Sequence, residues 1–310
     1  MSTPNPSMIV FGKNGQLGRA FQELFQDHPN VTFIDRQQCD LSNPLQIQKI
    51  LDRYQPQIIF NAAAYTAVDL AEKELDMAFA INATAPEVMA RYMSQIPNGV
   101  LVHYSTDYVF DGQKATPYEE TDLPNPLSQY GKSKLAGEIA IEKAFQQEPE
   151  VGSQVAKYFI LRTSWVYGDG SNFIKTMLKL AQEREQLKVV ADQFGVPTSA
   201  QWLAQLGYQL IQSNIPSGIY HAVPRGETSW HQLACFVIRV AKELQIPLKI
   251  NPDAIQAIPA TEYPLPAPRP YNSRMNNHKL QEALKAKQID FPISDWQEPV
   301  REYVKKILPK

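Results

Sequence analysis

The stretch Gly12-Lys13-Asn14-Gly15-Gln16-Leu17-Gly18 decides the fold, because it joins a short apolar run, residues 8–11, to an amphipathic segment that follows. Glycine has no Cβ, so a chain can turn tightly there and approach a pyrophosphate closely. A helix that begins in such a turn adds free N–H groups and a positive dipole end. The spacing differs from the G-x-G-x-x-G fingerprint of common dehydrogenases, and a plain glycine-rich turn is the alternative. We predict a dinucleotide-binding turn made by Gly12, Gly15, Gly18 and the helix-start residues Gln16 and Leu17.

Apolar runs and helical patterns alternate through the rest of the first half. Strands are expected at residues 31–34, 58–60, 100–104 and 158–162, and helices at 45–54, 77–93 and 130–145. Pro86 should kink or restart the second of these helices. Such alternation predicts βαβ units, and so an α/β fold with a Rossmann-like, doubly wound parallel sheet.

The second half is less regular. Helices are expected at residues 173–183, 200–212, 230–244, 279–286 and 298–308, with strands at 188–190 and 218–222. The proline-rich segment 252–270 predicts an extended loop or a mobile flap. We therefore expect an NAD(P)-binding domain at residues 1–168. A smaller, mainly substrate-binding α/β domain at 169–310 should be interleaved with it.

The end of the second expected strand carries two side chains that favour different cofactors. Asp35 is placed to bond a ribose diol, which favours NADH, whereas Arg36 could pair with the 2′-phosphate of NADPH. Arg36 as a solvated surface charge is the alternative. Asp40 and Leu41 would suit the adenine rim, or mark another helix-entry turn. The sequence leaves NADPH or NADH open.

Composition excludes several classes of protein. The net charge of −2 gives no reason to expect nucleic acid or an anionic membrane surface as a partner. Cys39 and Cys235 are the two cysteines and imply no disulfide framework, which fits a cytoplasmic protein. The five histidines show no metal-ligand spacing, so no metal is expected.

Tyr130-Gly131-Lys132-Ser133-Lys134 places a tyrosine and a lysine four residues apart, on one face of a helix. A carbonyl that receives a hydride also needs a proton, and a nearby ammonium lowers the pKa of a tyrosine that supplies it. Lys132 would face away from Tyr130. Thr106, in Ser105-Thr106-Asp107 at a strand end, could orient the carbonyl, or could simply cap a turn. We predict Tyr130, Lys134 and Thr106 as catalytic residues.

Together these motifs resemble the extended short-chain dehydrogenases/reductases, and within them the dTDP-4-dehydrorhamnose reductase family. The resemblance rests on the glycine turn and on the further blocks at residues 61–69, 105–112, 130–138, 161–168 and 268–273, which occur in the expected order over nearly the whole chain.

This resemblance implies NAD(P)H-dependent reduction of the C4 keto group of a dTDP-linked 6-deoxy sugar. Tyr130 would protonate the new alkoxide and Lys134 would also bind the nicotinamide ribose. Asp107 and Trp165 would line the sugar site and Arg269 would meet the diphosphate, although a core tryptophan and a surface arginine are the alternatives. The residues implied to run beside the cofactor are Ala62, Ala63, Ala64 and Tyr65.

Assembly is left open by the resemblance. Some members of the family pair through Mg²⁺ held by glutamates, but Ala20 stands where one of these would align, so a monomer or a homodimer is expected without metal. A sugar-nucleotide epimerase or dehydratase is the nearest rival, and Asp107-Tyr108 lacks the acidic pair of a dehydratase. A non-catalytic regulatory subunit on the same fold is the rival from another class.

Overall fold

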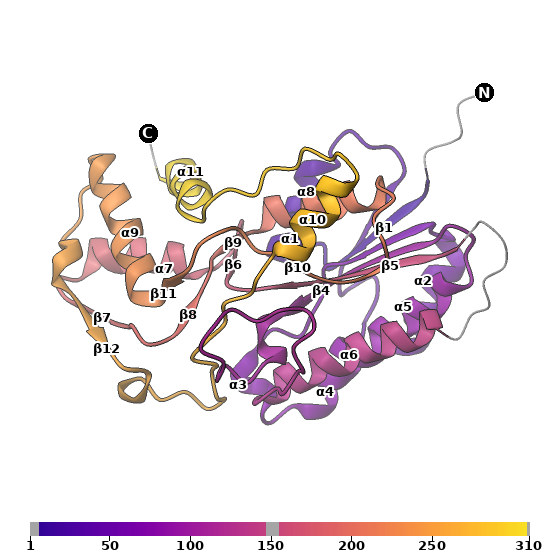
Figure 1. Ribbon diagram of the computed structural model, residues 1–310, viewed down its shortest axis with the longest axis horizontal. Helices are drawn as coiled ribbons and strands as arrows, with labels where there is room; N and C mark the ends of the chain where they lie inside the picture. Colours follow the sequence, from indigo (N-terminus) through magenta and orange to yellow (C-terminus); the bar gives the residue numbers. More distant parts are fainter. Residues whose placement is uncertain (1–5, 147–154, 309–310) are drawn as a thin grey trace.

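A six-stranded sheet in the order β10-β5-β4-β3-β1-β2 forms the centre of the computed structural model, which describes residues 6–146 and 155–308 (Figure 1). Every pair of neighbouring strands in it is parallel. The Rossmann-like, doubly wound parallel sheet predicted from the sequence is confirmed. Its strands are β1 (Met8–Phe11), β2 (Val31–Ile34), β3 (Ile58–Asn61), β4 (Val100–Thr106), β5 (Lys157–Thr163) and β10 (Gly218–His221).

Both faces of the sheet are covered, which explains why its strands are apolar runs and not alternating ones. In β1, Met8 and Val10 belong to the core on one face, whereas Ile9 and Phe11 belong to the core on the other. The helices fall into the same two layers (Figure 1). One layer holds α1 (Gln16–Leu24), α8 (Ala200–Ile211) and α10 (His278–Ala286); the other holds α2 (Pro44–Tyr54), α4 (Leu75–Phe79), α5 (Ala85–Ser94) and α6 (Gln129–Gln146).

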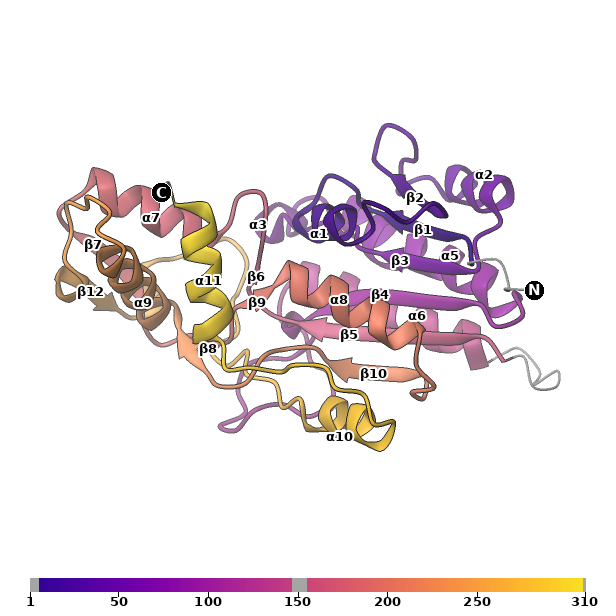
Figure 2. The same cartoon turned by 90° about the horizontal axis from the view of Figure 1, so that it is seen from above.

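A second group of elements, the C-terminal lobe, lies beyond the carboxyl ends of the sheet strands (Figure 2). Its helices pack into two further apolar clusters, one of which also includes Val109, Phe110 and Tyr118 from the segment after β4. Because β10, α8 and α10 return to the main sheet, the second half of the chain contributes to both parts; the boundary at residue 168 stays a prediction. The lobe consists of α7 (Phe173–Glu183), α9 (Trp230–Glu243) and α11 (Gln297–Ile307), with the strand pairs β7–β12 (Leu187–Val190, Ile255–Ile258) and β8–β11 (Phe194–Gly195, Thr228–Ser229).

The helix expected at residues 77–93 is interrupted before Pro86. A π-helical turn, η1 (Ala80–Thr84), separates α4 from α5, and Pro86 occupies the first turn of α5, a position where proline is common. Of the two expected outcomes, a kink or a restart, Pro86 marks a restart of the helix. The departure from α-helical geometry lies in the π turn before it.

The proline-rich segment is ordered where it meets the rest of the molecule. It contains β12, which pairs with β7, and short 3₁₀ turns at Pro252–Ala254 and Ala260–Glu262. Among the described residues, no helix is both long and apolar enough to cross a membrane.

Candidate active site

A pocket of about 270 Å³ opens where the strand order reverses, between β1 and its neighbours β2 and β3. In open α/β sheets this reversal leaves a crevice at the carboxyl ends of the strands, where ligands bind. The pocket is lined from β1 by Gly12, from β2 by Asp35, and from the segment after β3 by Ala63. Other predicted residues in its wall are Arg36, Asp40, Leu41, Ala64 and Tyr65.

The glycine turn is shaped as a phosphate-binding turn requires. Gly12 has φ +88°, and a Cβ there would lie 2.8 Å from the carbonyl oxygen of Ala62. A Cβ on Gly18 would lie 2.1 Å from the carbonyl oxygen of Gly12, so this glycine lets α1 pack against the strand. Gly15 caps α1 without a side-chain hydrogen bond, and a Cβ there would touch only Gly12, at 3.4 Å. The free N–H groups of this helix start and the space before them fit the diphosphate of a dinucleotide.

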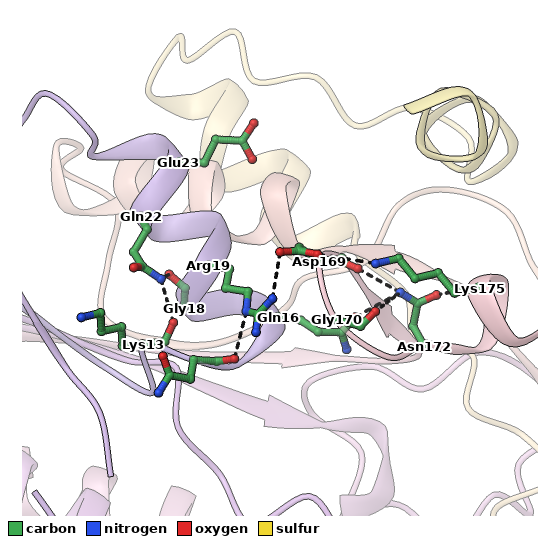
Figure 3. A network of polar contacts seen from close by, with 12 residues as sticks. Lys13, Gln16, Gly18, Arg19, Gln22, Glu23, Asp169, Gly170, Asn172 and Lys175 are labelled. Carbon is green, nitrogen blue, oxygen red and sulfur yellow. Dashed lines mark hydrogen bonds and ion pairs between the residues drawn. The ribbon is translucent and has the colours of Figure 1, made fainter. Parts of the chain in front are cut away.

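Two residues of the turn also serve packing. The Leu17 side chain is buried in the sheet core, so only its backbone is available to a phosphate. The Gln16 side chain donates to the carbonyl oxygen of Val166 in β6 (Val166–Tyr167) at 3.3 Å, in the segment that leads from the sheet to the C-terminal lobe. Figure 3 shows this junction, in which Arg19 of α1 also pairs with Asp169 at 3.0 Å. The helix that follows the glycine turn is therefore joined directly to the segment that leads into α7.

The two acidic side chains predicted to meet the adenosine end of the cofactor accept hydrogen bonds from backbone groups of their own turns. Asp35 accepts hydrogen bonds from the backbone of Gln37 and Gln38, at 3.0 and 3.1 Å. Asp40 accepts from the backbone and hydroxyl of Ser42, and these bonds lower the pKa of Asp40. Arg36 is exposed on the pocket wall.

Tyr130, Thr106 and Asp107 come together where β4 ends and α6 begins. The hydroxyl of Thr106 donates to Asp107 at 3.1 Å and accepts from the backbone N–H of Tyr108. Burial raises the pKa of Tyr130 to about 12, against a hydrogen bond with Thr106 that lowers it. Burial also raises the pKa of Asp107 to about 6. At neutral pH the phenol therefore keeps its proton.

Lys134 does not lie against the phenol in this structure. Its side chain is 1% exposed, and Nζ donates to the carbonyl oxygen of Tyr104 at 2.6 Å and lies 3.1 Å from Nε2 of His103. The amino group is held on β4, and Lys134 is not among the groups that shift the tyrosine pKa, which burial, Thr106 and Asp107 set.

Trp165 packs against α9 of the C-terminal lobe, whereas Arg269 lies beside Tyr108. Trp165 has φ +46° and stacks on Trp230, with ring centroids 3.6 Å apart. Arg269 donates to Asp69 at 2.9 Å, and its guanidinium carbon lies 5.9 Å from the ring centroid of Tyr108. Because the Tyr108 ring meets that of Tyr130 edge to face at 5.5 Å, Arg269 is linked to the tyrosine through one intervening ring.

The model of the RmlD substrate binding domain family matches residues 7–308, almost the entire chain. The chain belongs to the RmlD substrate binding domain family. The resemblance drawn from the motifs is thereby confirmed.

Relatives within this family match over their full lengths. The dTDP-4-dehydrorhamnose reductase of Shigella flexneri is 41% identical, over 97% of this chain and 98% of the relative. A crystal structure of a dTDP-4-dehydrorhamnose reductase from Clostridium acetobutylicum has a TM-score of 0.84 at 33% identity, covering 97% of this chain and 99% of the other. The Bacillus anthracis dTDP-4-dehydrorhamnose reductase, solved in complex with NADP, has a TM-score of 0.84 at 34% identity with the same coverage.

The sequence reading of this family member missed Asn82, a fully buried residue of the π turn. Its side chain accepts from the backbone N–H of Tyr65 at 2.8 Å and donates to the hydroxyl of Ser133 at 3.0 Å. Ser133 in turn donates to the carbonyl oxygen of Tyr130 at 2.8 Å. Asn82 therefore ties the wall of the cofactor pocket to the first turn of α6. The polar residue inside an apolar helical pattern was the available signal.

Proposed function

We propose that this chain reduces the C4 keto group of dTDP-4-dehydro-L-rhamnose to give dTDP-L-rhamnose, with NADPH or NADH as the reductant. The observation that supports the proposal is the meeting of Tyr130 and Thr106 at the same edge of the sheet as the pocket lined by Gly12 and Asp35, in a chain 41% identical to a dTDP-4-dehydrorhamnose reductase over nearly its whole length. The NADP in the Bacillus anthracis structure supports the cofactor class.

The roles proposed for the residues follow from their places. When bound, the nicotinamide cofactor supplies a hydride to the carbonyl carbon of the sugar. Burial keeps Tyr130 protonated. As the hydride displaces the π electron pair of the C=O bond onto oxygen, Tyr130 gives its phenolic proton to that oxygen. The Thr106 hydroxyl, fixed by Asp107, orients the same oxygen, while Lys134 stands one helical turn from Tyr130 to support the phenolate that remains.

Further roles are proposed for the pocket and its rim. Gly12, Gly15, Gln16, Leu17 and Gly18 would hold the diphosphate of the cofactor, and Ala62, Ala63, Ala64 and Tyr65 would lie along it. Asp35, Arg36, Asp40 and Leu41 would meet the adenosine end, with both reductants accepted. Asp107, Trp165 and Arg269 would line the sugar-nucleotide site. We propose a cytoplasmic enzyme that works as a monomer or a homodimer.

Oxidation of NADPH and of NADH by the purified protein, given dTDP-4-dehydro-L-rhamnose, tests the proposal. The wild-type protein should oxidise at least one of them, and Tyr130→Phe should lower kcat by about 10²-fold or more, as loss of a general acid does. Tyr108→Phe is the matched control, since Tyr108 touches Tyr130 but has no assigned proton to give. A folded wild-type protein that binds NADP but oxidises neither reductant would reject this substrate and favour another sugar nucleotide.

A further inference from the structure

Tyr130 lies in the first turn of α6, and two acceptors hold the backbone N–H groups on either side of it. Gln129 is the first residue of the helix, and its N–H donates to Oε1 of Glu72 at 2.8 Å. The N–H of Gly131 donates to the hydroxyl of Ser128 at 3.1 Å. Because the first N–H groups of a helix have no acceptor within it, these two contacts fix the turn that carries the tyrosine.

The two acceptors come from different parts of the chain. Ser128 directly precedes α6, and its buried side chain caps the helix locally. Glu72 directly follows α3 (Val68–Ala71), which packs beside α6 (Figure 1). A carboxylate that accepts from a backbone N–H makes a charge-assisted bond, and its charge is also favourable at the positive end of the helix dipole. Glu72 therefore binds the tyrosine turn to another element of the fold.

The position of Glu72 is set by the wall of the pocket proposed for the cofactor. Thr66 and Ala67, just before α3, line that pocket. The N–H of Ala71 donates to the carbonyl oxygen of Ala67 at 2.9 Å, and the Ala71 side chain is fully buried. Since Glu72 follows Ala71 directly, a short and anchored segment joins the pocket wall to the start of α6.

Other contacts restrain the tyrosine turn on its far side. A Cβ on Gly131 would lie 2.2 Å from the carbonyl oxygen of Tyr108, so the turn packs backbone to backbone against the segment after β4. The Ser133 hydroxyl donates to the carbonyl oxygen of Tyr130 at 2.8 Å. These contacts act beyond Tyr130 along the helix, whereas Glu72 acts where the helix begins.

We propose that Glu72 is a positioning residue, which fixes the first turn of α6 through the Gln129 N–H and so holds the Tyr130 hydroxyl where it can protonate the substrate carbonyl oxygen. This role rests on the proposed function of Tyr130. A proton donor must come within hydrogen-bonding distance of its acceptor, and a misplacement of about 1 Å can lower the rate by about 100-fold. Because Glu72 bonds to backbone and transfers no proton, its effect falls on kcat and not on the binding of NADPH.

Two substitutions test the contact. Glu72→Ala removes the acceptor, whereas Glu72→Gln keeps a carbonyl oxygen there and removes the charge. We expect Glu72→Ala to lower kcat by about 10-fold, as a small displacement of a reacting group does, and Glu72→Gln to keep kcat within about 2-fold of the wild type. Since Ala71 keeps α3 anchored, NADPH should bind both variants as tightly as it binds the wild type.

Steady-state kinetics and NADPH titration distinguish the outcomes. An unchanged kcat in Glu72→Ala would overturn the proposal. So would an equal loss in Glu72→Gln, which would mean that the carboxylate acts through its charge and not as an acceptor. Weaker NADPH binding in parallel with the loss of kcat would count against it too, because α3 would then have lost its structure.

Asn43→Ala is the matched control for the loss of an acceptor at a helix start. Asn43 accepts from the N–H groups of Leu45 and Gln46 at the start of α2, and it has no assigned part in the reaction. This variant should lose stability in urea unfolding much as Glu72→Ala does, but its kcat at saturating NADPH should equal that of the wild type. Equal losses of kcat in the two variants would show that turnover follows general stability and not the tyrosine turn.

Hydrogen exchange of the Gln129 amide tests the contact without substrate. It is followed by NMR on protein labelled with ¹⁵N-glutamine, with the signal identified by its loss in Gln129→Glu. Exchange should be slow in the wild type and in Glu72→Gln, and at least about 10-fold faster in Glu72→Ala. Fast exchange in the wild type would overturn the proposal, whatever the protein reduces. A protected amide in a wild type that turns over no sugar nucleotide would instead count against the proposed function alone.

Discussion

Arg269 is held beside Tyr108 by a single acidic residue. Asp69, at the start of α3 (Val68–Ala71), accepts from the backbone N–H of Ala267 at 3.1 Å and from the guanidinium of Arg269 at 2.9 Å. The Arg269 side chain is 15% exposed, and two of its nitrogens donate inside the protein, Nη1 to the Ala267 carbonyl oxygen and Nη2 to Asp69. The contact fixes the end of the proline-rich segment, so Arg269 could act on substrate directly or only through the position of that segment.

Two substitutions separate these roles. If Arg269 meets the diphosphate, Arg269→Ala should raise the KM for the sugar nucleotide by about 10-fold or more, the worth of a charge-assisted hydrogen bond. Asp69→Asn keeps the shape of the anchor and removes its charge, so KM should change little. Steady-state kinetics measure both. Equal rises in KM for the two variants would mean that Arg269 works through the segment and not on the substrate.

Single residues were predictable from the sequence where a motif sits at the end of a strand. Thr106 and Tyr130 meet because parallel strands deliver their carboxyl ends, and the helices that follow, to one edge of the sheet. The buried partners of Lys134 and of Asn82 were not predictable, since these contacts join different elements and no local pattern encodes them. The partner of Arg269 was missed for the same reason.

At the scale of elements, the strand runs and most helix starts follow from hydrophobic period and capping chemistry. Asn43, a typical helix-capping residue just before α2, accepts from two backbone N–H groups of that helix. The π turn could not be predicted from the sequence, because it depends on how closely α6 packs against it. A Cβ on Gly137 of α6 would lie 2.1 Å from the carbonyl oxygen of Asn82, so the two helices touch backbone to backbone at the place where the extra residue is accommodated.

The first βα unit offers a matched pair of glycine substitutions. Gly18→Ala places a Cβ 2.1 Å from the Gly12 carbonyl oxygen, so it should destabilise the protein by about 1–3 kcal/mol through overpacking. Gly15→Ala meets only a 3.4 Å contact, so folding should be nearly unchanged. Its methyl group faces the proposed phosphate site, however, and NADPH should bind at least several-fold more weakly. Urea unfolding and NADPH titration give the two quantities. Unweakened binding to Gly15→Ala would remove this turn from the cofactor site.

The whole molecule depends on contacts between the sheet and the C-terminal lobe that lie far apart in sequence. Gln16 of α1 and Asn172 before α7 meet at 3.4 Å, and Asn172 also binds the hydroxyl of Tyr303 in α11 at 2.8 Å. The hydrophobic periodicity of the sequence predicted each of these helices but not the contacts between them. It indicates which side of a helix is buried and not which element covers that side. For the same reason the return of β10 to the sheet edge could be expected only as a general interleaving of the two halves.

Acid stability is a property of the whole fold, because it depends on histidines buried between layers. Burial first, and then the charge of Arg162, lower the pKa of His221 to about 3. The folded state therefore resists a proton that the unfolded chain accepts near its ordinary pKa of about 6.5. The contribution of this neutral histidine to the free energy of unfolding is therefore fully present above pH 6.5. It is lost as pH falls toward 3, at up to about 1.4 kcal/mol per pH unit.

Comparison of wild type with His221→Gln isolates this effect, because every other titrating group is common to the two proteins. Asp107, whose pKa burial raises to about 6, acts in the opposite direction in both and cancels in the difference. Glutamine costs packing at any pH, so the wild type should be the more stable at pH 8. That advantage should shrink by about 1.4 kcal/mol for each pH unit below 6.5, as measured by urea unfolding between pH 8 and 5. A difference that stays constant over this range would mean that His221 takes up its proton in the folded protein, and that the interface between β10 and the segment around Asn276 opens to water.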